Sequence, residues 1–263
     1  MYEPRLDNPL SPTFQPLMDA LQVKMIMTPK KDFVYYEDCE NLENCEYDVL
    51  PCKDLKHYYD TKAKEKKHIL AEDVISADMC LLDLIDLFDE KHTVYFVKEG
   101  ADIVGLVHYS DLKKHPVRVL CYLMVSEIEL KFRGLLKERY SERRDELRDI
   151  LSETLDCSVW SKLQCLKKKD EKNGQDLTYV DYLYFSNFFE IFKKQKDLLD
   201  TLGLDSDELD SLKKSLKPVR NWAAHPAREE PPITGKIYKV LKEFKESYLK
   251  LTKHHLDSAL KKV

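Results

Sequence analysis

Short strand-like runs fill the first part of the chain, and helical periods fill the second part. Residues 93–97 and 103–108 are rich in branched and aromatic residues, which predicts two strands joined by a tight turn. Apolar residues recur at helical spacing in 80–91, which predicts an amphipathic helix. Residues 74–75 form a short strand before it, and 110–112 lead into another helix. The predicted order is strand–helix–strand–strand–helix.

The residues before this segment are less regular. A proline-rich lead-in covers residues 1–21 and is expected to end in a short helix, and residues 32–36 have the composition of a strand. Residues 37–48 are acidic and loop-like, and a lysine-rich connector covers 62–67. We therefore expect irregular structure with isolated strands here.

Helical periods dominate from about residue 119 onward. The pattern predicts five helices, at 119–153, 158–168, 178–199, 209–224 and 235–262. His115-Pro116 is the expected seam, because proline is favoured in the first turn of a helix. The predicted fold class is α+β, with a lead-in (1–21), an α/β module (22–118) and an all-α domain (119–263).

Charge is distributed unevenly over the 263 residues. Residues 1–115 hold 14 Lys+Arg and 23 Asp+Glu, or −9, which leaves 29 and 25 for the rest, or +4 of the total −5. The second part is therefore the better place for an RNA backbone. Seven scattered cysteines fit reduced thiols in the cytoplasm. We also expect neither a signal peptide nor a membrane span.

The chemistry of the second part concentrates in Arg220, Asn221 and His225. Arginine offers a rigid fork of donors to phosphate oxygens, and histidine exchanges a proton near neutral pH. In the alternative interpretation, His225 and Pro226 only close a helix and Trp222 anchors the core. Positions five apart on one helix also differ in direction by about 140°, so Arg220 and His225 do not share a face.

This motif resembles that of HEPN ribonucleases, in which Arg, a polar residue and, after a short gap, His lie late in an all-helical domain. The resemblance implies a homodimer in which both copies of the motif line one groove. It also implies that Arg220, Asn221 and His225 are catalytic and that RNA is the substrate.

The strand order of residues 74–112, with Ser110-Asp111-Leu112 after a strand, resembles a CBS repeat, the module of cystathionine β-synthase. The resemblance implies an adenine nucleotide as a regulatory ligand at Asp111, His108 and Ser110, with Asp54 closing a degenerate first repeat. His108 departs from the family pattern, which has threonine there. In the alternative interpretation the module is structural and Asp111 caps the following helix.

Three further features have two interpretations each. A basic strip, which includes Lys131, could contact RNA through Arg139, Arg143, Arg144 and Arg148, or form ion pairs on a solvated face. Aromatic residues of 178–199 could stack bases, but at helical spacing they more often form a core. Cys39, Cys45, Cys52 and His57 lack the close spacing of structural zinc sites, so we expect no metal ligands.

Together with the two resemblances, these features predict a cytoplasmic endoribonuclease that cleaves RNA by 2′-hydroxyl attack and needs no cofactor. The resemblances further imply that it is a dimer, that an adenine nucleotide controls it and that it acts in defence or stress responses. The alternatives are a non-catalytic adenine-nucleotide sensor that serves as a dimerisation scaffold, and a non-catalytic RNA-binding protein.

Overall fold

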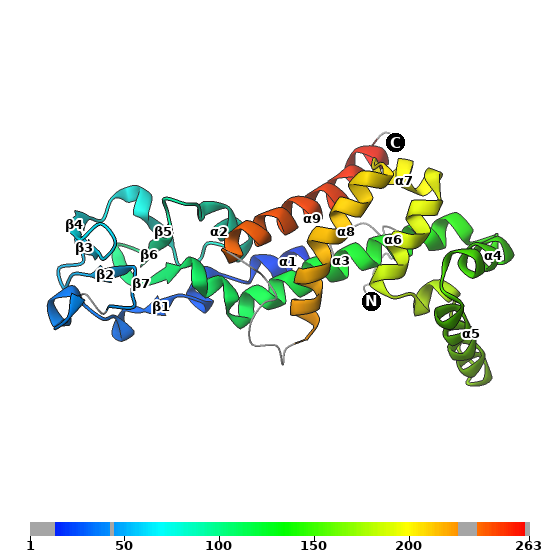
Figure 1. The fold of residues 1–263 in the computed structure, drawn as a ribbon, viewed down its shortest axis with the longest axis horizontal. Coiled ribbons are helices and arrows are strands. Elements are labelled where there is room, and N and C mark those ends of the chain that lie inside the picture. Colours follow the sequence, from blue (N-terminus) through cyan, green and yellow to red (C-terminus); the bar gives the residue numbers. More distant parts are fainter. Residues whose placement is uncertain (1–13, 43–44, 226–235, 261–263) are drawn as a thin grey trace, which may run out of the picture. The chain divides into compact units, whose positions relative to one another are not determined.

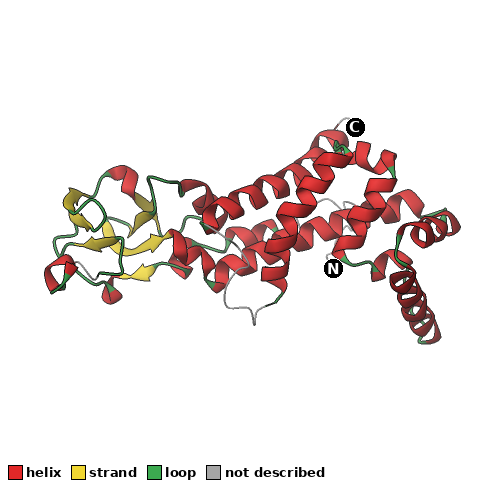
Figure 2. Ribbon diagram, in the orientation of Figure 1, coloured by secondary structure: helices red, strands yellow, loops and turns green. Residues whose placement is uncertain are grey.

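The structure is a computed structural model that describes residues 14–42, 45–225 and 236–260. It has a mixed α+β fold, with strands in the first part of the chain and helices in the rest (Figure 2). The described residues divide into two compact units. One holds Leu123–Asn221 and the helical residues from Phe244 onward, and we call it the helical unit. The other, the mixed unit, holds Gln15–Tyr122 and Trp222–Glu243.

A four-stranded sheet forms the centre of the mixed unit, with the order β1-β7-β6-β5 (Figure 1). Its strands are β1 (Thr28–Pro29), β5 (Val74–Ser76), β6 (Val94–Glu99) and β7 (Asp102–His108). β5 and β6 are parallel, and the other pairs are antiparallel. The sequence predicted β5, β6 and β7 in this order.

Glycine is favoured in the turn between β6 and β7 and is required at one position within β7. Gly100 has a φ of 60° in the turn between β6 and β7, a conformation that glycine adopts without a steric penalty. A Cβ atom on Gly105 would lie 2.8 Å from the carbonyl oxygen of Thr28, because β1 pairs with β7 directly over this residue. The short edge strand β1 therefore depends on the missing side chain at 105.

A second sheet has three antiparallel strands, β2 (Val49–Pro51), β3 (His57–Asp60) and β4 (Glu65–His68). β4 corrects the prediction of a lysine-rich connector at 62–67. Asp60 Oδ1 accepts hydrogen bonds from the backbone N–H groups of Lys62 and Ala63, and Lys64 adopts a φ of 57°, so the charged segment turns back as a hairpin.

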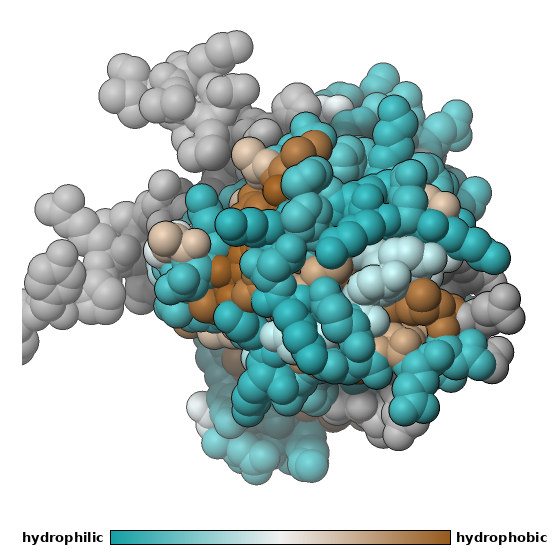
Figure 3. Space-filling view, turned by 90° about the vertical axis from the view of Figure 1, so that its left-hand side faces the viewer, coloured by the Kyte–Doolittle hydropathy of each residue, from teal (hydrophilic) through white to brown (hydrophobic). Residues whose placement is uncertain are grey.

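Other local predictions for the mixed unit are corrected in the same way. Residues 32–36 were predicted to be a strand, but they run from the last residue of one 3-10 helix, η2 (Lys30–Asp32), to the first residue of another, η3 (Tyr36–Asp38). The helix predicted at 80–91 is shorter, as α2 covers Leu81–Leu87. α1 (Gln15–Asp19) matches the short helix expected at the end of the lead-in. The face of the mixed unit seen in Figure 3 is mainly hydrophilic, with small hydrophobic patches.

Helices α3 to α9 are the α-helices of the rest of the described chain. Their bounds are α3 (His115–Tyr140), α4 (Arg144–Thr154), α5 (Cys157–Lys172), α6 (Phe185–Lys194), α7 (Lys196–Leu202), α8 (Ser206–Ala224) and α9 (Ile237–Leu260). There are thus seven described helices where the sequence predicted five. The division into units falls within α3, α8 and α9.

Two predicted helices are interrupted. The helix predicted at 119–153 breaks after Tyr140, where the Arg143 guanidinium donates to the carbonyl oxygen of Arg139 at 2.9 Å. The helix predicted at 178–199 is divided into a 3-10 helix, η7 (Tyr179–Tyr182), and α6 and α7. Polar side chains cap η7 and α6, since Asp181 accepts from the Thr178 backbone N–H and Asn187 from the Tyr184 backbone N–H.

Aromatic residues form the core of the helical unit. The ring of Phe132 on α3 lies 4.9–5.8 Å from three rings of α6, those of Phe188, Phe189 and Phe192. The Arg133 guanidinium donates to the carbonyl oxygens of Val180 and Leu183 at 2.7 and 2.9 Å. These contacts fix the segment before α6 against α3.

Candidate functional site

α8 carries Arg220 and Asn221 near its C-terminal end. Its N-terminus has a reciprocal cap, because Asp205 Oδ1 accepts from the Glu208 backbone N–H and Glu208 Oε2 accepts from that of Asp205. Pro218 lies inside the helix and has no N–H to bond to the carbonyl oxygen of the preceding turn. Arg220 and Asn221 therefore follow a weakened turn of a well-anchored helix.

A cavity of about 340 Å³ lies beside these residues, between α6 and α8 of the helical unit. It is lined by Tyr184, Phe185, Ser186, Phe189, Glu190, Lys213, Lys217, Arg220 and Asn221. We call it the α6–α8 cavity. Three cationic side chains and one carboxylate line it, so it favours an anionic ligand. Lys213 and Lys217 belong to no motif that the sequence indicates.

Arg220 is half-buried, and its Nη1 donates to Asn221 Oδ1 at 3.4 Å. In the described part of the chain no carboxylate forms an ion pair with it. The charge of Arg220 acts on Glu129 of α3, a side chain that sequence reasoning missed. Burial raises the pKa of Glu129, and the charges of Arg133 and Arg220 oppose that rise. No spacing along the sequence links Glu129 with Arg220, because only the packing of α3 and α8 relates them.

The four arginines predicted to bind RNA are all engaged with carboxylates. Arg139 pairs with Asp197 at 2.6 Å, Arg143 with Glu146 at 3.2 Å, Arg144 with Asp176 at 3.9 Å and Arg148 with Asp145 at 3.3 Å. These contacts agree with the ion-pair interpretation of the strip. Arg144 and Arg148 also line a larger cavity, of about 640 Å³, which has four cationic and four acidic side chains.

Trp222 and His225 belong to the mixed unit. Trp222 is fully buried, and the Arg118 guanidinium lies 5.0 Å from the centre of its ring. His225 is exposed and directly follows Ala224, the last residue of α8. The structure thus places Arg220 and Asn221 in one unit and His225 in the other. Pro226 lies outside the described residues.

Asp111 lies inside the 3-10 helix η6 (Tyr109–Lys113) and caps the N-terminus of that helix, whereas the alternative interpretation had it capping the helix that follows. Asp111 is only 8% exposed, and Oδ2 accepts from the His108 backbone N–H at 2.7 Å. Oδ1 pairs with Lys114 at 2.8 Å. The carboxylate proposed to hold a ribose is therefore already bound by its own segment.

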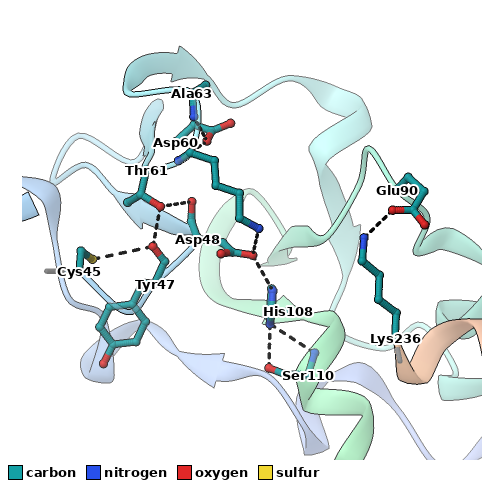
Figure 4. Close-up of polar contacts among 11 residues, drawn as sticks. Cys45, Tyr47, Asp48, Asp60, Thr61, Ala63, Glu90, His108, Ser110 and Lys236 are labelled. Carbon is teal, nitrogen blue, oxygen red and sulfur yellow. Dashed lines mark hydrogen bonds and ion pairs between the residues drawn. The ribbon is translucent and has the colours of Figure 1, made fainter. Parts of the chain in front are cut away.

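His108 and Ser110 belong to a polar network that joins the two sheets of the mixed unit (Figure 4). His108 Nε2 lies 3.3 Å from Asp48 Oδ2, which also pairs with Lys62, and Nδ1 lies 2.7 Å from Ser110 Oγ. Burial lowers the pKa of His108, and the Asp48 carboxylate opposes that effect. The histidine that stands where the CBS pattern has threonine thus makes structural contacts with Asp48 and Ser110.

Asp54 lies in a separate turn. Its Oδ1 accepts hydrogen bonds from the backbone N–H groups of Lys56 and His57, and its Oδ2 pairs with His57 Nδ1 at 2.6 Å. These hydrogen bonds lower the pKa of Asp54 to about 2. Its oxygens are therefore used to hold the loop between β2 and β3.

Two other expectations concern buried residues. Lys131 was placed on an exposed strip, but the side chain is only 5% exposed, because α3 turns this position toward the core. Among the aromatic residues of 178–199, Phe185, Phe188, Phe189 and Phe192 are buried, as expected for core positions. Tyr184 differs from them, since it is 46% exposed.

The cysteines near residue 45 make local contacts in the structure. The thiols of Cys39 and Cys45 each donate to a backbone carbonyl two residues ahead, and Cys52 is buried. The described residues contain no group of three or more His, Cys, Asp or Glu side chains placed to hold a metal ion.

None of the helices in the described segments is both long and apolar enough to cross a membrane. Comparison of the chain with models of protein families, with curated proteins and with solved structures finds no match.

Proposed function

We propose that the chain is a metal-independent endoribonuclease that acts at the C-terminal end of α8. The observation that supports this proposal is the state of Arg220. It lines a cationic cavity and has no ion-pair partner in the described chain, whereas each of the four arginines predicted to bind RNA has one. An arginine in this state can bind a phosphate without breaking an existing ion pair.

In the proposed reaction His225 takes the proton of an RNA 2′-hydroxyl, and the resulting oxygen attacks the adjacent phosphorus. The bond from phosphorus to the 5′-oxygen breaks, and that oxygen takes up a proton. Arg220 stabilises the negative charge that develops on the phosphate, and Asn221 orients it. The products carry a 2′,3′-cyclic phosphate and a 5′-hydroxyl, and DNA is not cleaved.

The test is cleavage of a mixed-sequence RNA in EDTA by wild type, His225→Ala and Arg220→Ala. His115→Ala is the matched control, because His115 is also exposed and lies in the same unit as His225. We expect cyclic phosphate products from wild type and His115→Ala, and a loss of roughly 100-fold or more from each of the other variants. Equal rates in all four proteins, or no cleavage by any, would refute the proposal.

The regulatory part of the proposal is that an adenine nucleotide binds near Asp111, His108, Ser110 and Asp54 and changes the cleavage rate. Each arm of the cleavage assay is therefore repeated with adenine nucleotides. If nucleotides bind but no RNA is cut, the sensor and scaffold alternative gains support. RNA binding without cleavage would instead support the RNA-binding alternative.

A further inference from the structure

We infer that the α6–α8 cavity binds one unpaired nucleotide of single-stranded RNA, with its phosphate at Lys217 and Arg220 and its base against Tyr184. This inference rests on the proposed function, because it gives the nuclease a subsite that selects single-stranded substrate. All of the residues that carry it lie within the helical unit.

The cationic side of the cavity is one face of α8. Lys213, Lys217 and Arg220 occupy positions i, i+4 and i+7, which lie on the same side of a helix. Lys213 is 3.8 Å from Glu190 across the cavity. Lys217 is exposed and, within the described residues, has no ion pair. Lys217 and Arg220 therefore offer two adjacent charges to a phosphate group.

The opposite wall is aromatic. Tyr184 is 46% exposed, and its backbone N–H is held by Asn187 Oδ1 at 2.9 Å, so the residue has a fixed position at the start of α6. The Lys162 ammonium lies 5.6 Å from the centre of the Tyr184 ring and adds a further positive charge nearby. An exposed tyrosine beside cations is the combination that single-strand-binding proteins use to stack a base next to its phosphate.

The size and remaining lining of the cavity also fit one nucleotide. A volume of about 340 Å³ is at the small end of the range for ligand sites. Phe185 and Phe189 are buried and form an apolar floor, while Ser186 and Asn221 supply polar groups. A base in a duplex has both faces covered by its neighbours, so only an unpaired base can stack on Tyr184.

The test measures binding separately from cleavage. A fluorescently labelled 2′-O-methyl RNA, which lacks the attacking hydroxyl, is titrated by anisotropy in single-stranded and duplex form. The variants are Tyr184→Ala and Lys217→Glu. Tyr47→Ala controls for loss of an exposed tyrosine, and Lys214→Glu controls for a charge reversal on α8 outside the cavity. Circular dichroism confirms that each variant is folded.

We expect wild type to prefer the single strand, and Tyr184→Ala to weaken binding by roughly 5- to 100-fold, as for loss of one stacked base. Lys217→Glu should weaken binding and lower the salt dependence by about one ion, while both controls bind as wild type does. Equal effects of Lys217→Glu and Lys214→Glu, no effect of Tyr184→Ala, or equal binding of duplex would each overturn the inference.

The two proposals fail separately. If the cavity variants lose binding but wild type cuts no RNA, the subsite stands and the nuclease falls. If wild type cuts RNA and the cavity variants bind and cut as it does, the nuclease stands and the subsite falls.

Discussion

At the scale of single residues, Lys131 shows how far burial can shift the pKa of a side chain. Its amine is buried, and among the described groups Nζ has no hydrogen-bond partner. Burial lowers the pKa of Lys131 to about 8, against the opposing charge of Glu127 one turn earlier on α3. Below pH 8 the amine is charged in both the folded and the unfolded chain, so the full cost of burying that charge is present.

Replacing Lys131 by methionine should therefore stabilise the protein at pH 7 by about 2 kcal/mol, because the apolar side chain removes a buried charge. Above pH 8 the Lys131 amine loses its proton in the folded chain but keeps it in the unfolded chain, so the free energy of unfolding of wild type rises. The difference in this free energy between Lys131→Met and wild type therefore narrows toward pH 10. Urea unfolding at several pH values measures both effects. Lys214→Met, at an exposed position, is the control and should change little.

At the scale of elements, the contact between α3 and α6 organises the helical unit. Phe132 meets three phenylalanine rings and is fully buried. The adjacent Arg133 binds two carbonyl oxygens of the segment that precedes α6. Because Tyr184 lies on that segment, the position of the cavity wall depends on the same contact.

Phe132→Ala should destabilise the protein by about 3–5 kcal/mol, since it removes a large buried side chain and leaves a cavity among the other rings. Chemical denaturation measures the loss. Leu130→Ala on the same helix is the comparison, because Leu130 is 46% exposed and should cost far less. Similar losses from both substitutions would contradict the central place of Phe132 in this core.

Local sequence patterns predicted the elements that have strong periods. β5, β6, β7 and the burial of the aromatic residues of α6 follow from runs of apolar residues. The break after Tyr140 was missed because no glycine or proline marks it, and β4 was missed because its residues are charged. Both are fixed by side-chain hydrogen bonds rather than by hydrophobic spacing.

The residues of the candidate site likewise fall into those that the sequence could indicate and those that only the fold brings together. Arg220, Asn221 and His225 are close in sequence, so a motif could indicate them. Lys213 and Lys217 were visible as charges, but their cavity exists only where α6 meets α8. Glu129 was hidden, since its relation to Arg220 is purely tertiary.

At the scale of the whole molecule, the division of the motif between two units bears on the proposed homodimer. If each active site combines Arg220 of one subunit with His225 of another, a mixture of Arg220→Ala and His225→Ala should regain activity, because some dimers then hold one intact pair. Cleavage assays after co-refolding measure this, and light scattering gives the mass. A mixture that stays inactive, or a fully active monomer, would contradict the composite site.

The same division affects the order in which the protein can fold during its synthesis. Residues 222–243 complete the mixed unit, although most of that unit is made before residue 123. The last part of the mixed unit, which contains Trp222 and Tyr238, therefore leaves the ribosome only after the segment 123–221 of the helical unit has been translated. The two units therefore cannot fold one after the other during synthesis, because each contains residues from late in the chain. Both units should become stable late and nearly together.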